Sequence, residues 1–247
     1  MIKTNKNFNI NKLINTFIEN KIGNYKLENN KSIKFRYEYL YNNIEKNIFI
    51  YLQNWNQLIN LYKIIPEKDR HFYEIIDEKC KFFLDLDAKY EDIDKKEWED
   101  DIKFIKQELK CFFDKVFKKN VCILEYQSFP TEYEKKYSCH LIIPDYCFYA
   151  DDCKNIINMF INTINIKYKN IIDDKVYGKR RMLRIEGSTK INSNRKKVYI
   201  NNVKNNTQLI CLEGLITNLE NTELLNTTSF IHNVMNREIK DNYEEKR

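Results

Sequence analysis

The heptapeptide Lys81-Phe82-Phe83-Leu84-Asp85-Leu86-Asp87 decides the fold of this 247-residue chain. Its apolar run predicts a buried strand over residues 80–87 that ends in two acids separated by one residue. Because side chains alternate between the faces of a strand, Asp85 and Asp87 point the same way, while the leucines point into the core. Two carboxylates this close repel each other unless a cation lies between them. A divalent metal with oxygen ligands is the natural partner of this pair.

Paired acids suit nucleotidyl transfer, in which one metal ion lowers the pKa of an attacking 3′-hydroxyl and another stabilises the departing pyrophosphate. A short Asp-x-Asp motif also occurs at ordinary strand ends on protein surfaces. Here the acids directly follow an apolar strand, and strand ends of this kind form the edges of binding sites. Asp85 and Asp87 are therefore candidate ligands of a catalytic metal.

A second polar cluster lies on the strand predicted at residues 137–143, which Pro144 is expected to end. On that strand Ser138 and His140 share one face, so a hydroxyl and an imidazole are together available to phosphate oxygens. Lys136 stands at the strand entrance, within reach of the same anion. A histidine held by an ordinary neighbour is one alternative for His140, and a metal-ligand role is another.

A third cluster, at residues 173–190, opens with acids and continues as a dense basic run. Asp173 or Asp174 can supply a third carboxylate to the metal pair. The basic side chains can bind a triphosphate or a template backbone, and arginine does so with a planar fork of donors. They are Lys179, Arg180, Arg181, Arg184 and Lys190. A solvated basic loop is the alternative interpretation of this segment.

Predicted helices and strands alternate along the chain, which indicates an α/β or α+β core. Helices are predicted at residues 12–20, 54–65 and 94–118, and from 151 or 152 to 168. Further strands are predicted at residues 121–126 and, as a hairpin, at 197–203 and 208–212.

Composition and charge narrow the choice of partner and compartment. The 42 basic and 36 acidic residues leave a net charge of +6, which permits a polyanionic partner without requiring one. Seven cysteines without a Cys-x-x-Cys pair indicate free thiols and argue against a disulfide framework or a zinc module. No apolar run approaches the ~18–20 residues of a membrane span, and no signal peptide opens the chain. We expect a soluble, intracellular protein, in the cytoplasm or nucleus of a host.

The bias toward Asn, Ile, Lys and Tyr is typical of an A/T-rich genome and fits a large DNA virus, a mobile element or a protist equally well.

Taken together, the clusters resemble the three motifs of the archaeo-eukaryotic primase superfamily, which occur in the same order. The resemblance is closest to the branch of primase-polymerases and large-DNA-virus primases, and it covers about residues 70–190. The matching segments are Asp85-Leu86-Asp87, Ser138-Cys139-His140, Asp173-Asp174-Lys175-Val176-Tyr177, Arg181-Met182-Leu183-Arg184 and Ser188-Thr189-Lys190, with the lead-in His71-Phe72-Tyr73-Glu74-Ile75-Ile76. The register of the third motif favours Asp173 over Asp174 as its acid.

The resemblance implies a fold and a reaction. The fold is an N-terminal mixed αβ module beside an RNA-recognition-like antiparallel sheet module, with the active cleft between them. The expected organisation is an N-terminal arm or lead-in at residues 1–32, a catalytic core of two packed modules at 33–235, and a frayed tail at 236–247. The reaction is attack of a 3′-hydroxyl on a nucleoside triphosphate, directed by a DNA template, for primer synthesis or extension.

The resemblance also implies roles for the site residues. Asp85, Asp87 and Asp173 would hold two Mg²⁺ or Mn²⁺ ions. The side chains implied to bind the triphosphate are Lys136, Ser138, His140, Arg181, Arg184 and Lys190, with the template strand as an alternative for Arg181. Lys179 and Arg180 are candidates for nucleic-acid contact, and Arg36 is a candidate for the family's N-terminal basic residue at the nucleotide. A DNA template and primer, nucleoside triphosphates and a replicative helicase are the implied partners.

Two features leave other interpretations open. Related chains often carry a C-terminal zinc module that assists primer initiation, and this sequence has no Cys/His set for one, which favours extension over de novo priming. A metal-dependent glycosyltransferase also uses an Asp-x-Asp motif, but it does not explain Ser138-Cys139-His140 or the basic cluster. A non-catalytic nucleic-acid-binding module is a third possibility, against which the presence of all three acids argues.

Overall fold

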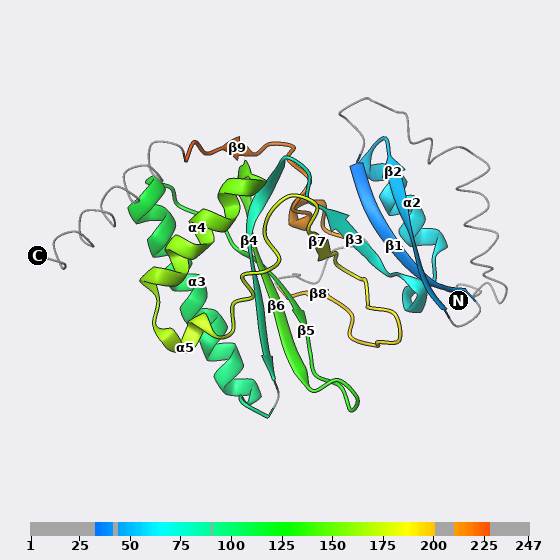
Figure 1. The fold of residues 1–247 in the computed structure, drawn as a ribbon, viewed down its shortest axis with the longest axis horizontal. Helices are drawn as coiled ribbons and strands as arrows, with labels where there is room; N and C mark the ends of the chain where they lie inside the picture. The colour runs from blue at the N-terminus through cyan, green and yellow to red at the C-terminus, as the bar shows by residue number, and fades with distance from the viewer. Residues whose placement is uncertain (1–32, 42–43, 90, 201–209, 228–247) are drawn as a thin grey trace, which may run out of the picture.

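The computed structural model describes residues 33–41, 44–89, 91–200 and 210–227. Two antiparallel sheets lie side by side, each backed by helices (Figure 1). The smaller sheet has the order β2-β1-β3-β7 and the larger has β4-β6-β5-β8, with β9 added in parallel to β6. This mixed architecture agrees with the predicted α+β fold. The helix predicted at 12–20, the arm at 1–32, the tail at 236–247 and the centre of the predicted 197–212 hairpin lie outside the described residues.

The strand bounds are β1 Ile33–Tyr41, β2 Ile44–Leu52, β3 Phe72–Ile75, β4 Lys79–Lys89, β5 Leu124–Ser128, β6 Lys136–Tyr149, β7 Met182–Arg184, β8 Val198–Tyr199 and β9 Glu223–Leu224. The helices are α2 Trp55–Ile64, α3 Lys95–Phe117, α4 Ala150–Thr163 and α5 Ile166–Lys169, with short 3₁₀ turns η1 Glu67–Asp69 and η2 Leu212–Gly214.

The smaller sheet packs one face against α2. Asn54 caps this helix, as its side-chain oxygen accepts from the Gln57 amide at 3.2 Å. The helix confirms the prediction at residues 54–65. The buried side chains of this core alternate along β1 and β2, so the intervening residues occupy the opposite face. The core residues from the strands are Phe35, Tyr37, Ile50, Leu52 and Phe72, and those from the helix are Leu58, Leu61 and Tyr62.

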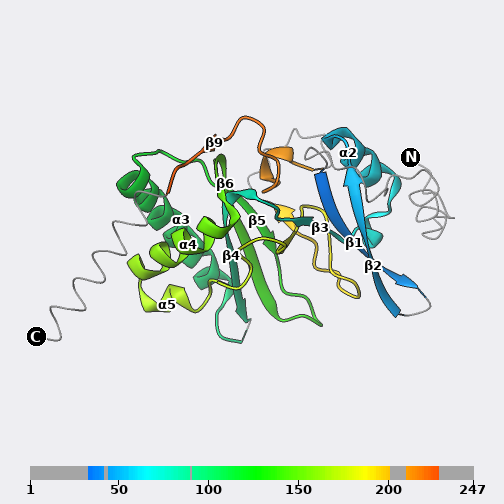
Figure 2. The same ribbon diagram turned by 45° about the horizontal axis from the view of Figure 1, so that its top comes forward.

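The larger sheet packs against α3, α4 and α5, which lie together on one of its faces (Figure 2). Asp94 caps α3, as its carboxylate accepts from the Glu97 amide at 2.8 Å, and the helix confirms the prediction at residues 94–118. Trp98, Ile105 and Phe113 on its inner face are fully buried. No helix in the described ranges is long and apolar enough to cross a membrane.

The hairpin predicted at 197–203 and 208–212 is wrong where its residues are described, because β8 pairs with β5 and residues 210–212 form a bend and the start of η2. Four other element predictions differ from the structure. Strand β6 continues through Pro144, because the register shifts opposite Lys81 and Phe82 and places residues 144–146 in a bulge that needs no ladder amide. Strand β5 begins at Leu124 rather than at residue 121. The helix predicted to run to residue 168 breaks after Thr163 into α4 and α5, and neither Asp151 nor Asp152 caps it, since both lie inside its first turn.

The fourth difference is β7, which forms inside the basic segment where no strand was predicted. It is three residues long, and it exists through its pairing with β3, in which Tyr73 lies opposite Arg184. A strand of this length has no detectable periodicity of its own. Its consequence is to place Arg184 on the smaller sheet at the border with the larger one.

The segment formed by η2 and the residues that follow it joins the two sheets through buried polar contacts. Glu74 of β3 accepts from both the amide and the hydroxyl of Thr217, each at 2.8 Å. Lys81 of β4 donates from Nζ to the Glu213 carbonyl oxygen at 2.8 Å. Both side chains are almost fully buried. Burial raises the pKa of Glu74 to about 7, against 4.5 ordinarily, although the Thr217 bonds and the Lys81 charge lower it.

Glu74→Gln is expected to become more stable relative to the wild type as the pH rises. Below about pH 4.5 Glu74 is neutral in the folded and unfolded states, whereas above about pH 7 folding requires a buried carboxylate. The raised folded-state pKa therefore removes stability from the wild type across that window, by about 3 kcal/mol in all. Urea unfolding at pH 5 and pH 8 measures this difference. The exposed Glu78→Gln is the matched control, and an unchanged difference for Glu74→Gln at the two pH values would contradict the prediction.

Candidate metal and nucleotide site

Three acids from distant parts of the sequence meet at the end of β4. Asp85 and Asp87 lie on this strand, and residues 171–173 run antiparallel beside it. The Asp173 amide donates to the Asp85 carbonyl oxygen at 2.9 Å, and the Asp87 amide donates to the Ile171 carbonyl oxygen at 2.7 Å. One carboxylate oxygen from each acid lies within 4.8 Å of the other two. Backbone pairing therefore fixes Asp173 beside the other two acids.

The environment of Asp85 fits a divalent cation. Burial and then the neighbouring Asp87 raise the pKa of Asp85 to about 7, with a smaller contribution from Asp173, while Lys197 and Lys136 lower it. Its Oδ1 is buried and has no hydrogen-bond partner in the described part of the chain. A buried, unpartnered carboxylate oxygen beside two further acids is an unfavourable arrangement without a cation. Three carboxylates are the hard oxygen donors that Mg²⁺ and Mn²⁺ accept.

Asp174, the fallback for the third acid, lies outside this cluster. Its side chain is exposed, whereas Asp173 is half-buried. A turn follows, in which Asp173 Oδ1 accepts from the Lys175 amide at 2.9 Å. The register taken from the third motif therefore selected the acid that meets Asp85 and Asp87.

Strand β6 places the second cluster directly opposite the acids. Asp85 pairs with His140 and Asp87 pairs with Ser138. The predicted alternation is present, since Tyr137, Cys139 and Leu141 lie in the core of the larger sheet. His140 Nε2 lies 3.4 Å from Asp85 Oδ1. Burial, and then the charges of Lys197 and Arg184, hold the pKa of His140 well below its usual range, so the imidazole is neutral.

Lys136 contacts the cluster of three acids through Asp87. Its Nζ lies 2.7 Å from Asp87 Oδ2, and both side chains are partly exposed. The ammonium group of a lysine at this position can move from Asp87 to an oxygen of a bound anion, because the lysine side chain is long and flexible.

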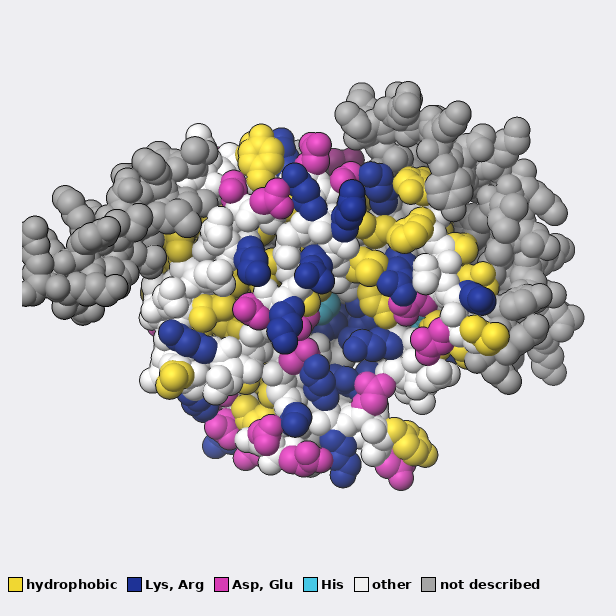
Figure 3. All heavy atoms as spheres, viewed as in Figure 1, with side chains coloured by type: hydrophobic (Ala, Val, Ile, Leu, Met, Phe, Trp, Pro, Cys, Tyr) yellow, Lys and Arg dark blue, Asp and Glu magenta, His cyan; other side chains and the backbone are white. Residues whose placement is uncertain are grey.

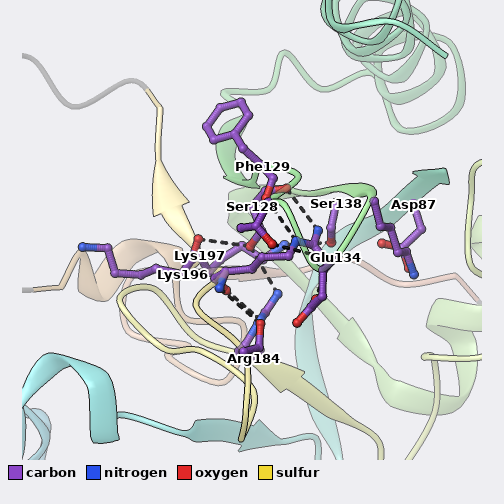
Figure 4. A network of polar contacts seen from close by, with 12 residues as sticks. Asp87, Ser128, Phe129, Glu134, Ser138, Arg184, Lys196 and Lys197 are labelled. Atoms are coloured by element: carbon purple, nitrogen blue, oxygen red, sulfur yellow. Dashed lines mark hydrogen bonds and ion pairs between the residues drawn. The ribbon is translucent and has the colours of Figure 1, made fainter. Parts of the chain in front are cut away.

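Two buried cations line the other side of the site. Arg184 donates from Nη1 to the Arg195 carbonyl oxygen at 3.0 Å and from Nη2 to Ser128 Oγ at 3.2 Å. Lys197 donates from Nζ to Ser138 Oγ at 3.1 Å. Among the described residues neither forms an ion pair with a carboxylate, and both are nearly buried. Figure 4 shows these side chains in one network beside Asp87.

Sequence reasoning missed Lys197 and Arg195, which belong to no motif. Arg195 fastens the β5–β6 connection by donating to the Phe129 and Ser128 carbonyl oxygens and to the Glu134 carboxylate, at 3.0 to 3.2 Å. The one available signal was the run of three basic residues, 195–197, at the entrance of a predicted strand. A run of this kind is ordinarily a solvated surface.

The remaining predicted basic residues are spread over the surface. Lys179 forms an ion pair with Asp151 of α4 at 3.0 Å. Arg180 and Arg181 are exposed, as is Lys190.

Arg36 lies on the smaller sheet in the same cross-strand row as Arg184. It pairs with Tyr73 of β3, which in turn pairs with Arg184. Its guanidinium contacts Glu38 at 2.9 Å and the Met182 sulfur at 3.7 Å. Figure 3 shows a hollow near the centre of the molecular face seen in Figure 1, with a histidine at its floor and basic and acidic side chains around it.

Two antiparallel sheets lie side by side, and the larger one brings three acids together and pairs a Ser-x-His strand with the first two. This arrangement is typical of a domain of the archaeo-eukaryotic primase (AEP) type. The chain matches the family model of the C962R protein N-terminal AEP domain over residues 15–204, and it belongs to that family, within the large-DNA-virus branch of the superfamily. No curated protein matches the chain. The AEP family is one of primase-polymerase-like nucleotidyltransferases, and it generally uses divalent metals.

Proposed function

We propose that this chain is a DNA-directed primase-polymerase domain, which adds nucleotides from nucleoside triphosphates to a 3′-hydroxyl on a DNA template. The observation that carries the proposal is that three convergent acids lie beside two buried cations, which have no carboxylate partner in the part of the chain that the structure describes. The acids attract divalent metal, and the cations attract a polyanion. A metal-bound nucleoside triphosphate satisfies both halves of the site at once.

Asp85, Asp87 and Asp173 are the residues that would hold Mg²⁺ or Mn²⁺, as two ions. When bound, these ions activate the attacking hydroxyl and neutralise the charge that develops on the phosphates. The chain's own groups supply position and charge. Arg184 presents buried guanidinium donors to the triphosphate, and Ser138 presents a hydroxyl on the strand opposite Asp87.

The neutral imidazole of His140 supplies one N–H donor without adding charge beside Asp85. Lys136 is half-buried beside Asp87, whereas Arg181 and Lys190 are exposed on the surface. We assign all three to the outer phosphates, with the template strand as the alternative for Arg181. Lys179 and Arg180 are proposed to contact the nucleic-acid backbone, where exposed cations contribute salt-dependent affinity. A primed DNA template is the proposed macromolecular partner, with a replicative helicase as a further one.

The test is a primer-extension assay with a labelled primer on a DNA template, carried out with Mg²⁺ or Mn²⁺ and each nucleoside triphosphate in turn. The expected result is template-directed extension that EDTA abolishes and that excess Mg²⁺ restores. Parallel reactions without a primer measure de novo priming. Transfer from a nucleotide-sugar without stimulation by DNA would overturn the proposal, and so would tight DNA binding with no nucleotide incorporation under any of these conditions.

A further inference from the structure

Lys197 is a buried lysine that immediately precedes β8 and donates a hydrogen bond to one side chain of the site, that of Ser138. Its side chain is almost fully buried, and its Nζ lies 3.1 Å from Ser138 Oγ. Ser138 is itself nearly buried and lies opposite Asp87 on β6. A charged ammonium group has three donors and no acceptor, so the serine oxygen accepts this bond. The hydroxyl hydrogen of Ser138 is then free to be donated elsewhere.

The surroundings of Lys197 supply no compensating carboxylate contact within the described ranges. Among the charged groups that act on it, Arg184 opposes its charge, whereas Asp85 and Asp87 favour it. Burial, and then Arg184, lower the pKa of Lys197 to about 7. A buried cation with only neutral hydrogen-bond partners costs stability unless an anion binds nearby. Arg184 also has only neutral hydrogen-bond partners among the described residues, so the site contains two buried cations that an anionic ligand would stabilise.

We propose that Lys197 is a positioning residue for the incoming nucleoside triphosphate: it fixes the Ser138 hydroxyl as a hydrogen-bond donor toward a phosphate oxygen. The inference rests on the proposed function and assigns a role to a residue outside the three motifs. Lys197 acts through Ser138, since that hydroxyl is its hydrogen-bond partner.

A purely structural role makes the opposite prediction for stability. If Lys197 were present to hold the fold, its loss would lower the melting temperature. If it is present for the ligand, replacing a buried cation with an apolar side chain of similar length leaves the melting temperature of the free protein unchanged or raises it. Nucleotide affinity and stability therefore change in different directions only if Lys197 serves the ligand.

The experiment compares Lys197→Met with Lys196→Met, its neighbour, whose ammonium pairs with the exposed Glu67. Binding of ATP and of dATP in Mg²⁺ is measured by calorimetry, together with the melting temperature of each free protein. We expect Lys197→Met to weaken triphosphate binding about ten-fold or more, as for loss of a hydrogen bond to a charged group. We expect Lys196→Met to bind as the wild type does.

A double-mutant cycle with Ser138→Ala tests whether Lys197 acts through the hydroxyl. We expect Lys197→Met to weaken binding by less than about two-fold further once Ser138 is alanine, because the two residues form one unit. Independent, multiplying effects would overturn the positioning role, and so would a lowered melting temperature with unchanged affinity. If the wild type binds neither nucleotide, this inference and the proposed function both fail. If the wild type binds and Lys197→Met binds equally well, this inference alone fails.

Discussion

Replacing Asp85 with asparagine is expected to lower the rate of primer extension by a factor of about a thousand or more. The substitution keeps the shape of the side chain and removes one of the three clustered carboxylates. Loss of a charged ligand from a metal site that carries the developing negative charge is among the largest single effects in catalysis. The rate is measured as single-turnover extension of a labelled primer at saturating nucleotide, over a range of Mn²⁺ concentrations.

The same substitution is expected to raise the melting temperature of the metal-free protein. Asp85 is half-buried, but its Oδ1 atom is buried and has no hydrogen-bond partner among the described residues, so a neutral amide is less costly there than a carboxylate. Asp174→Asn is the matched control, because Asp174 adjoins the third acid in sequence but is exposed and outside the cluster. Wild-type extension by Asp85→Asn, or an equal loss in Asp174→Asn, would refute the assignment of the metal site.

Replacing Arg184 with methionine is expected to raise the KM for the nucleoside triphosphate about a hundred-fold, with a smaller effect on kcat. The guanidinium is the buried donor group of the pocket, and charge-assisted bonds to phosphate are about twice as strong as neutral ones. The substitution also leaves the Arg195 carbonyl oxygen without its donor, so some stability is lost as well. Steady-state extension at varied nucleotide concentration measures the two constants separately.

Arg70→Met is the matched control for Arg184→Met. Arg70 likewise donates to main-chain carbonyl oxygens, those of Ile65 and Tyr62, at 3.1 and 2.6 Å. We expect it to lose stability to a similar extent without a change in KM. If both variants raise KM equally, the effect comes from general loss of structure, and the assignment of Arg184 to the triphosphate is wrong.

The three acids were predictable because two of them obey the period-two alternation of a single apolar strand, and the third belongs to a motif with a fixed register. Ser138 and His140 were predictable for the same reason, since alternation is a local property of the strand. The pairing of Asp87 with Ser138 could not be predicted from the sequence, because the register depends on which strands pair with each other in the sheet.

Lys197 and β7 were missed for a different physical reason. Lys197 is buried beside Ser138 of β6 and interacts with the charge of Arg184 on β7, and these two residues come from separate parts of the chain. A basic run with no apolar alternation predicts a solvated surface. The end of β6 was misplaced because Pro144 breaks a regular ladder but is accommodated in a bulge, which no local signal announces.

Asp173 lies 88 positions after Asp85 in the chain, which has a consequence for synthesis of the protein on the ribosome. The two proposed ligands on β4 are translated first. The third joins them only when residues 171–173 have been translated and have paired with the edge of β4. Closing so long a loop is slow relative to local folding. A nascent chain shorter than this has two of the three acids, so the proposed metal site is completed late, after β4, β5 and β6 have been synthesised.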